Sequence, residues 1–85
     1  MMEPTVQDLV NNNLPVTREM YELTATGHDP TLLPGLEETM PAYVRNDELK
    51  DIPTSDPDYY RIVEMMEDFP HLTVESVRRA LKHLV

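Results

Sequence analysis

The sequence contains no cysteine and no tryptophan, and it has only two glycines and one phenylalanine among its 85 residues. Without cysteine, the chain can form neither disulfide bonds nor thiolate metal sites, and it lacks the strongest nucleophile among the side chains. Two isolated glycines cannot build a glycine-rich loop for phosphate groups. Because aromatic residues are few, the core has to be built from leucine, valine, methionine and the four tyrosines.

Long apolar segments are missing as well. No stretch approaches the ~18 consecutive apolar residues of a membrane-spanning helix, and the first residues show no basic region followed by an apolar run. Together with the absence of cysteine, this favours a cytoplasmic protein that makes no membrane contact. The length suits one small domain over 1–85. We expect its parts to be N-terminal helices over 5–27, an irregular proline-rich strap over 28–55 and a helix pair over 56–85.

Basic residues are few. Seven Lys and Arg stand against sixteen Asp and Glu, which gives a net charge of −9 at pH 7. The acidity lies in residues 1–70, because residues 71–85 contain three basic residues and one acidic residue. Such acidity opposes nonspecific binding to nucleic acids and anionic membranes, and it favours partners with a basic surface. A surface that only keeps the protein in solution would have the same composition.

Two helices are predicted near the N-terminus. The first runs over 5–12, where Thr5 and Asp8 have the spacing of a capping box. The second follows Thr17, a good N-cap residue, and ends at Gly27, which can adopt the left-handed conformation that closes a helix.

Proline interrupts the middle of the chain, so no long helix can cross it. We expect one or two single-turn helices there, starting near Asp29 and Thr39, with a proline just inside each. Extended stretches should pack over the rest of the molecule as the strap. The segment is too apolar to be disordered. Its apolar residues are Leu32, Leu33, Leu36, Met40, Tyr43, Val44, Leu49 and Ile52.

The C-terminal third carries the clearest helical pattern. Asp56 as N-cap and Pro57 in the first turn predict the start of one helix, and Thr73 predicts the N-cap of the next. The first helix should bury a face made by Tyr59, Ile62, Val63 and Met66. The second should bury Val74, Val77, Ala80, Leu81 and Leu84. Since no segment alternates as a strand does, the sequence predicts an all-α domain of three to four helices with a C-terminal helix hairpin.

Residues 69–81, with the sequence FPHLTVESVRRAL, resemble the closing helix of small bacterial antitoxin-like helix-turn-helix domains. In that family an aromatic-Pro-x-Leu-Thr turn leads into a helix that ends in Ala-Leu. Residues 14–30 resemble a sequence motif that is common in small bacterial and phage proteins. These resemblances imply a bacterial or phage protein with an antitoxin-like or inhibitor-like role.

No group of residues suits catalysis or metal binding. The three histidines are scattered, and no two have the spacing at which one helix presents two ligands. Asp56 and Asp58 lack the glycine and the later glutamate of a calcium loop. We therefore expect a binding protein that is not an enzyme and that has no cofactor and no metal.

The first binding hypothesis is an acidic surface that contacts a basic surface of another protein. Such contact would modulate or inhibit the partner, including at a surface that otherwise binds nucleic acid. The expected contact residues are Asp47, Glu48, Asp51, Glu64, Glu67 and Asp68.

Two other hypotheses stay open. The last helix could bind DNA as the recognition helix of a helix-turn-helix, through Arg78, Arg79 and Lys82. The acidic remainder of the chain disfavours this. Alternatively, Tyr60 and Met65 fall beside the main apolar stripe of their helix and could form an exposed patch for a homodimer.

Overall fold

The computed structural model describes residues 2–27 and 35–83, and these residues form six α-helices. In chain order they are α1 (Pro4–Asn11), α2 (Arg18–Thr26), α3 (Leu36–Thr39), α4 (Ala42–Arg45), α5 (Tyr59–Asp68) and α6 (Val74–His83). The all-α prediction is confirmed, and neither described part of the chain contains a strand. The helices outnumber the predicted three to four because α3 and α4 are separate single-turn helices.

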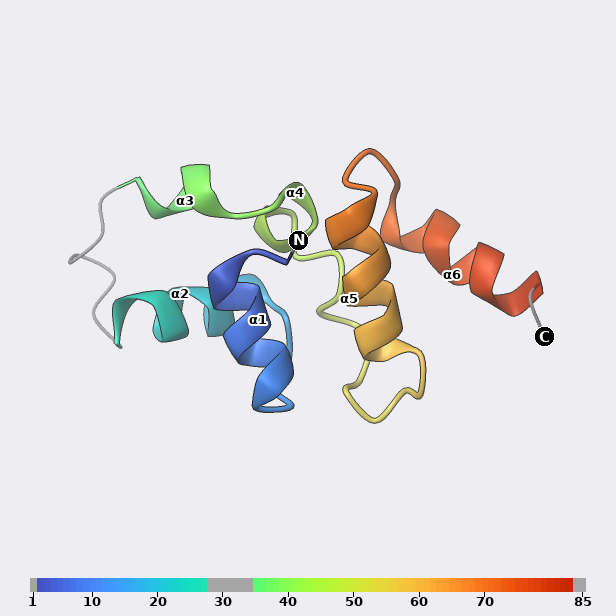
Figure 1. Ribbon diagram of the computed structural model, residues 1–85, viewed down its shortest axis with the longest axis horizontal. Coiled ribbons are helices and arrows are strands. Elements are labelled where there is room, and N and C mark those ends of the chain that lie inside the picture. The colour runs from blue at the N-terminus through green and yellow to red at the C-terminus, as the bar shows by residue number, and fades with distance from the viewer. Residues whose placement is uncertain (1, 28–34, 84–85) are drawn as a thin grey trace.

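The molecule is elongated, with extents of 44 × 25 × 23 Å. Figure 1 shows α1, α2 and α3 at one end, α4 and α5 in the middle, and α6 at the other end. The helices α1 and α2 pack against each other, and α5 packs against α6. Within the described ranges, no helix is long and apolar enough to cross a membrane.

One core cluster joins the two ends. Its buried side chains are Val6, Leu9, Val16, Tyr21, Met40, Tyr43, Val44, Leu49, Ile52, Tyr59, Ile62, Val63, Met66, Val74, Val77 and Leu81. Five of them, from Met40 to Ile52, belong to the proline-rich middle segment, so this segment supplies part of the core. Leu32 and Leu33 lie outside the described residues.

The first helix begins earlier than its sequence pattern indicated. Its N-cap is Glu3, whose carboxylate accepts a hydrogen bond from the Val6 amide (3.0 Å), and Pro4 occupies the first helical position. The Thr5–Asp8 capping box is therefore wrong, because Glu3 and Pro4 already start the helix one residue before Thr5.

The second helix has the predicted ends. The Thr17 hydroxyl accepts a hydrogen bond from the Met20 amide (3.2 Å), and Gly27 closes α2 with a φ of 63°. Because that backbone region strains other L-residues, glycine suits this position.

Single-turn helices in the middle segment are confirmed, but their starts differ from the prediction. Pro41 is the N-cap of α4 and does not lie inside its first turn. The other short helix, α3, follows Gly35, whose φ is 82°. The predicted start at Asp29 lies outside the described residues.

The start of α5 was predicted two residues too early: its N-cap is Asp58 and its first residue is Tyr59. The Asp56 carboxylate accepts a hydrogen bond from the Asp58 amide (2.9 Å) and so closes a turn before the helix, with Pro57 in that turn. Asp56 is therefore not the N-cap, because a side chain bonded in this turn competes with helix formation. The predicted apolar face is confirmed: Tyr59, Ile62, Val63 and Met66 are all buried.

The predicted N-cap of α6 is confirmed. The Thr73 hydroxyl accepts a hydrogen bond from the Ser76 amide (3.1 Å), and the Ser76 hydroxyl accepts one from the Thr73 amide (3.2 Å). Val74, Val77 and Leu81 are buried. Ala80 is exposed, contrary to the prediction, because only the narrow stripe of these three side chains faces the core. Leu84 lies outside the described residues.

Candidate functional site

The six acidic residues expected to contact a partner do not form one surface. Two of them bind the starts of helices within the chain. Asp47 accepts a hydrogen bond from the Arg18 amide at the start of α2 (3.1 Å), and Glu48 accepts one from the Val74 amide at the start of α6 (3.3 Å). Negative charge is favourable at both places because the first amides of a helix point toward it.

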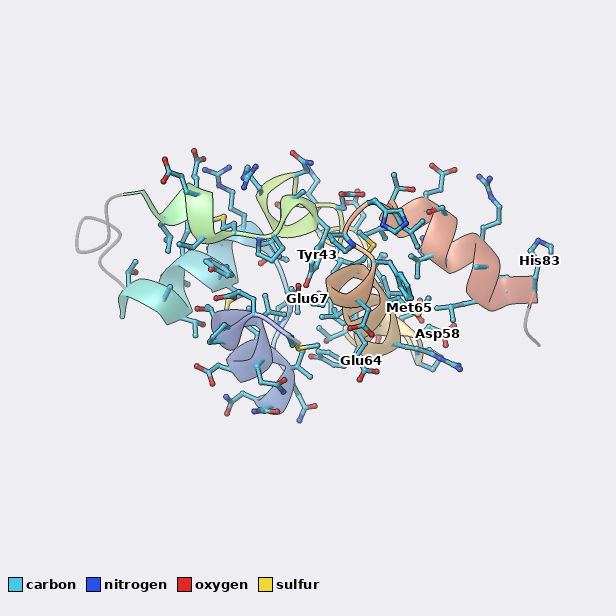
Figure 2. The ribbon with its side chains drawn as sticks, turned by 45° about the horizontal axis from the view of Figure 1, so that its top comes forward. Tyr43, Asp58, Glu64, Met65, Glu67 and His83 are labelled. Carbon is cyan, nitrogen blue, oxygen red and sulfur yellow. The ribbon has the colours of Figure 1, made fainter. Side chains whose placement is uncertain are left out.

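Glu67 also forms a hydrogen bond within the chain. Its carboxylate accepts a hydrogen bond from the Glu3 amide (3.1 Å), which ties the end of α5 to the start of α1. Burial raises the pKa of Glu67 by more than this hydrogen bond lowers it, and the charge of Glu3 adds to the rise. Figure 2 shows Tyr43 beside Glu67. The Tyr43 hydroxyl is buried without a hydrogen-bond partner among the described residues, and its pKa is raised by burial and by the Glu67 charge.

The other three acidic residues are exposed. Glu64 and Asp68 lie one turn apart on α5, and Asp51 lies in the turn before Ile52. They are available to a partner, whereas Asp47, Glu48 and Glu67 are already bonded within the chain.

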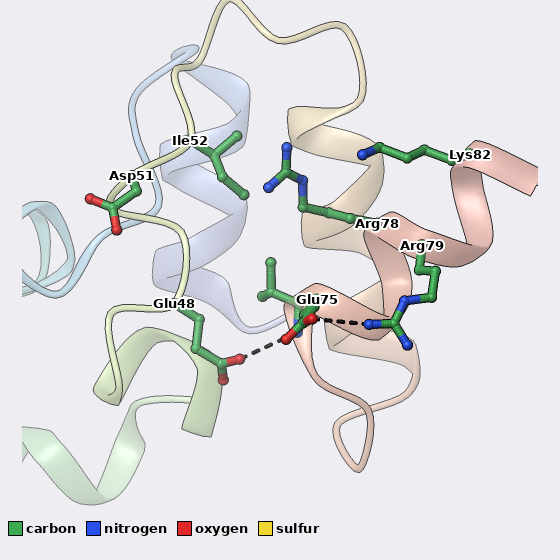
Figure 3. Close-up of a pocket in the computed structure, with 8 residues that line it drawn as sticks. Glu48, Asp51, Ile52, Glu75, Arg78, Arg79 and Lys82 are labelled. Carbon is green, nitrogen blue, oxygen red and sulfur yellow. Dashed lines mark hydrogen bonds and ion pairs between the residues drawn. The ribbon is translucent and has the colours of Figure 1, made fainter.

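A groove lies between α6 and the turn that follows α4, with a cavity volume of about 460 Å³ (Figure 3). We call it the α6 groove. It is lined by Glu48, Asp51, Ile52, Val74, Glu75, Arg78, Arg79 and Lys82. The groove therefore brings residues of the acidic hypothesis together with all three residues of the DNA hypothesis.

Two cations of α6 reach into this groove. Arg78 and Lys82, which we call the basic pair, lie one helical turn apart and extend toward the segment that carries Ile52 (Figure 3). In the described parts of the chain, Arg18 pairs with Glu22 and Glu37, and Arg79 with Glu75. Neither member of the basic pair has a carboxylate within ion-pair distance there, so both positive charges remain available.

Carboxylates border the basic pair on both sides, and we call them the acidic rim. Glu48, Asp51 and Glu75 line the α6 groove, and Asp56 and Asp58 line a smaller hollow of about 60 Å³ against the basic pair. The floor is apolar: Ile52 is 8% exposed and Val74 is 4% exposed. The groove thus combines two free cations, an apolar floor and a negative border.

The N-terminus of α6 bears on the DNA hypothesis. A recognition helix presents its first turn to the DNA, where free backbone amides also suit phosphate. Here Glu48 occupies the Val74 amide, and Glu75 is exposed in the same turn. Both carboxylates would face the phosphates of a bound duplex.

The patch expected to support a homodimer is partly covered. Tyr60 and Met65 pack against the core, and the Tyr60 hydroxyl donates a hydrogen bond to the Leu14 carbonyl (2.9 Å). Among the described residues, the large apolar side chain that is exposed is instead Phe69, at 44%, in the turn between α5 and α6. Its ring meets His71 edge-on. The only sequence signal for this exposure is the position of Phe69 directly before Pro70, after the helical pattern has ended.

Metal ligands do not gather in residues 2–27 and 35–83, where no three His, Asp or Glu side chains lie close enough to hold a metal ion together. Comparisons with known protein families, with curated proteins and with solved structures found no match. The resemblance of residues 69–81 to antitoxin-like domains therefore stays a prediction.

Proposed function

We propose that the protein is a small acidic protein-binding module that modulates or inhibits a partner protein through the α6 groove. The observation that carries the proposal is that Arg78 and Lys82 form no ion pair with any described residue, although they lie in a groove whose border is negative. Charged groups left unpaired beside an apolar floor suit a ligand that brings both polar and apolar contacts.

The mixed charge of the groove favours a polypeptide over a nucleic acid. A nucleic acid brings a continuous row of phosphates, and the acidic rim would repel those next to the one that met the basic pair. A protein segment can match both signs in order along its length.

The overall charge supports a partner with a basic surface. With a net charge of −9, the molecule attracts such a surface over a distance of about a Debye length before contact. Exposed Asp51, Glu64 and Asp68 contribute to this attraction. By covering a basic surface, the module would block whatever that surface otherwise binds, which is the inhibitory role implied by the antitoxin-like resemblance.

The proposal does not include catalysis. The α6 groove offers cations and carboxylates but no serine, histidine or cysteine among its lining residues. General base catalysis by a carboxylate needs a reacting group held against it, and the Glu48 carboxylate is already bonded to Val74.

Affinity capture with matched charge variants tests the proposal. The full chain, R78E and R61E are immobilised and exposed to a nuclease-treated bacterial lysate, and retained proteins are quantified by mass spectrometry. Arg61 is an exposed arginine of α5 outside the groove, so both variants change the net charge equally. We expect a partner that the native protein and R61E retain, and that R78E retains about tenfold less.

The same capture without nuclease distinguishes DNA binding from the proposed protein binding. Recovery of DNA, with loss of every protein after nuclease treatment, would replace the proposal by DNA binding through Arg78, Arg79 and Lys82. A partner retained equally by R78E and R61E would show protein binding at a different surface.

A further inference from the structure

We infer that the α6 groove receives one carboxylate of the partner between Arg78 and Lys82, on a segment that is otherwise basic and apolar. This inference rests on the proposed function and specifies the chemistry of the partner. It names an acidic anchor within a basic surface, which the net charge of the protein alone would not suggest.

The basic pair is arranged to hold one carboxylate. The two side chains project from successive turns of α6 into the same groove, and no carboxylate of the described residues lies within ion-pair distance of either one. A guanidinium can bind a carboxylate through two parallel hydrogen bonds, and the more flexible ammonium of Lys82 can add a third. A single carboxylate therefore matches the pair in both geometry and charge.

The acidic rim restricts which residues can flank the anchor. Glu48 and Asp51 lie on one side of the basic pair, and Asp56 and Asp58 lie on the other. A second negative group beside the anchor would meet these carboxylates at once, so the residues flanking the anchor should be basic or neutral. The rim thus selects an isolated carboxylate and rejects an acidic run.

The floor of the α6 groove favours an apolar residue beside the anchor. Ile52 and Val74 form an apolar floor next to the basic pair, and an apolar side chain beside the anchor would cover this floor and the aliphatic stems of Arg78 and Lys82. Because water is then excluded, the attraction between the anchor and the basic pair strengthens. The segment that fits carries an acidic residue with an apolar neighbour and basic flanks.

Selection from a displayed library of random short peptides against the immobilised full chain tests this inference. Enriched peptides are synthesised, and their affinities for the native protein, R78E and R61E are measured by fluorescence anisotropy. We expect enriched sequences to carry one Asp or Glu among basic and apolar residues. We also expect R78E to bind them about tenfold more weakly than R61E does.

Exchanging the charges of the peptide anchor and of Arg78 tests whether the two groups contact each other. Replacing the acidic residue of an enriched peptide by lysine should abolish binding to the native protein and restore binding to R78E. If the anchor is the carboxyl terminus of the peptide, amidation will remove binding while a change of internal acidic residues will not. Both results support a carboxylate anchor and differ only in its source.

Contrary outcomes separate this inference from the proposed function. Enrichment of purely basic peptides that R78E and R61E bind equally would overturn the carboxylate anchor, and so would a failure to enrich any peptide. The proposed function would survive either result if capture of the lysate partner still depended on Arg78. Loss of that dependence would overturn both.

Discussion

Glu67 lies in surroundings that differ from those of Glu64, one turn earlier on α5. Glu64 is exposed, whereas Glu67 is half-buried against the start of α1, near the carboxylate of Glu3 and the buried hydroxyl of Tyr43. Burial is the main cause of its raised pKa. The folded protein therefore binds a proton at Glu67 more readily than the unfolded chain does.

This difference predicts a pH-dependent stability. A raised pKa means that Glu67 favours the folded state below its ordinary pKa of 4.5, and that this advantage is lost as the pH rises through the raised value. Glu67→Gln removes the charge and keeps an oxygen that can accept from the Glu3 amide. We expect E67Q to melt at a higher temperature than the native protein near neutral pH, with the gain shrinking toward pH 4.5.

Thermal melting followed by circular dichroism over this pH range measures the effect. Glu64→Gln is the matched control, since it removes the same charge from an exposed position one turn earlier on the same helix. A stability difference between E67Q and the native protein that is constant across the range would contradict the assignment to Glu67.

Which acidic side chains form hydrogen bonds within the chain could not be predicted from the sequence. The composition indicated an acidic binding protein, and the acidic residues of the C-terminal half were visible. Which of them are free depends on partners distant in the chain: Asp47 bonds 29 residues away, Glu48 26 residues away and Glu67 64 residues away. No local pattern encodes such pairs, and the α6 groove, which joins Ile52 to Arg78, was missed for the same reason.

Helix ends were predictable where their signals are local. The caps of α2 and α6 use side chains that bond to amides three residues later, so Thr17 and Thr73 were recognised from the sequence. The start of α5 was not, because Asp56 bonds to the amide two residues later and forms a turn. An aspartate before a proline is compatible with a helix N-cap and with such a turn, so the sequence does not distinguish them.

The Thr73 cap is expected to stabilise α6 and, through it, the folded protein. Thr73→Ala removes the oxygen that accepts from the Ser76 amide, and the loss of such a cap lowers the free energy of unfolding by about 1 kcal/mol. Thr54→Ala is the control, because Thr54 is exposed in the loop before α5. Urea unfolding measures both variants. Equal stabilities would show that Thr73 contributes nothing as a cap.

At the scale of the molecule, the two ends are joined through a shared core and through hydrogen bonds from α5. The buried amide of Val16, between α1 and α2, donates to the Tyr59 hydroxyl (2.7 Å). The neighbouring Tyr60 hydroxyl donates to the Leu14 carbonyl in a more open position. A third link joins the end of α5 to the start of α1, where the Glu67 carboxylate accepts a hydrogen bond from the Glu3 amide (3.1 Å).

These links predict that the protein unfolds as one unit and that Tyr59 matters most to this cooperativity. Tyr59→Phe leaves the Val16 amide buried without an acceptor, which costs about 1–3 kcal/mol of stability. Tyr60→Phe should cost about 0.5–1 kcal/mol, because water can replace the lost bond at the partly exposed Leu14.

Urea unfolding, followed in parallel by far-ultraviolet circular dichroism and by tyrosine fluorescence, tests both expectations. Coincident transitions in the native protein indicate two-state unfolding, in which both ends lose their structure together. A Y59F variant as stable as Y60F would show that the Val16 hydrogen bond contributes no more than the Leu14 hydrogen bond. Two separated transitions would mean that α5 and α6 hold their structure independently of α1 and α2. The α6 groove would then be a property of the C-terminal helix pair and its adjoining turn, and would no longer depend on the whole fold.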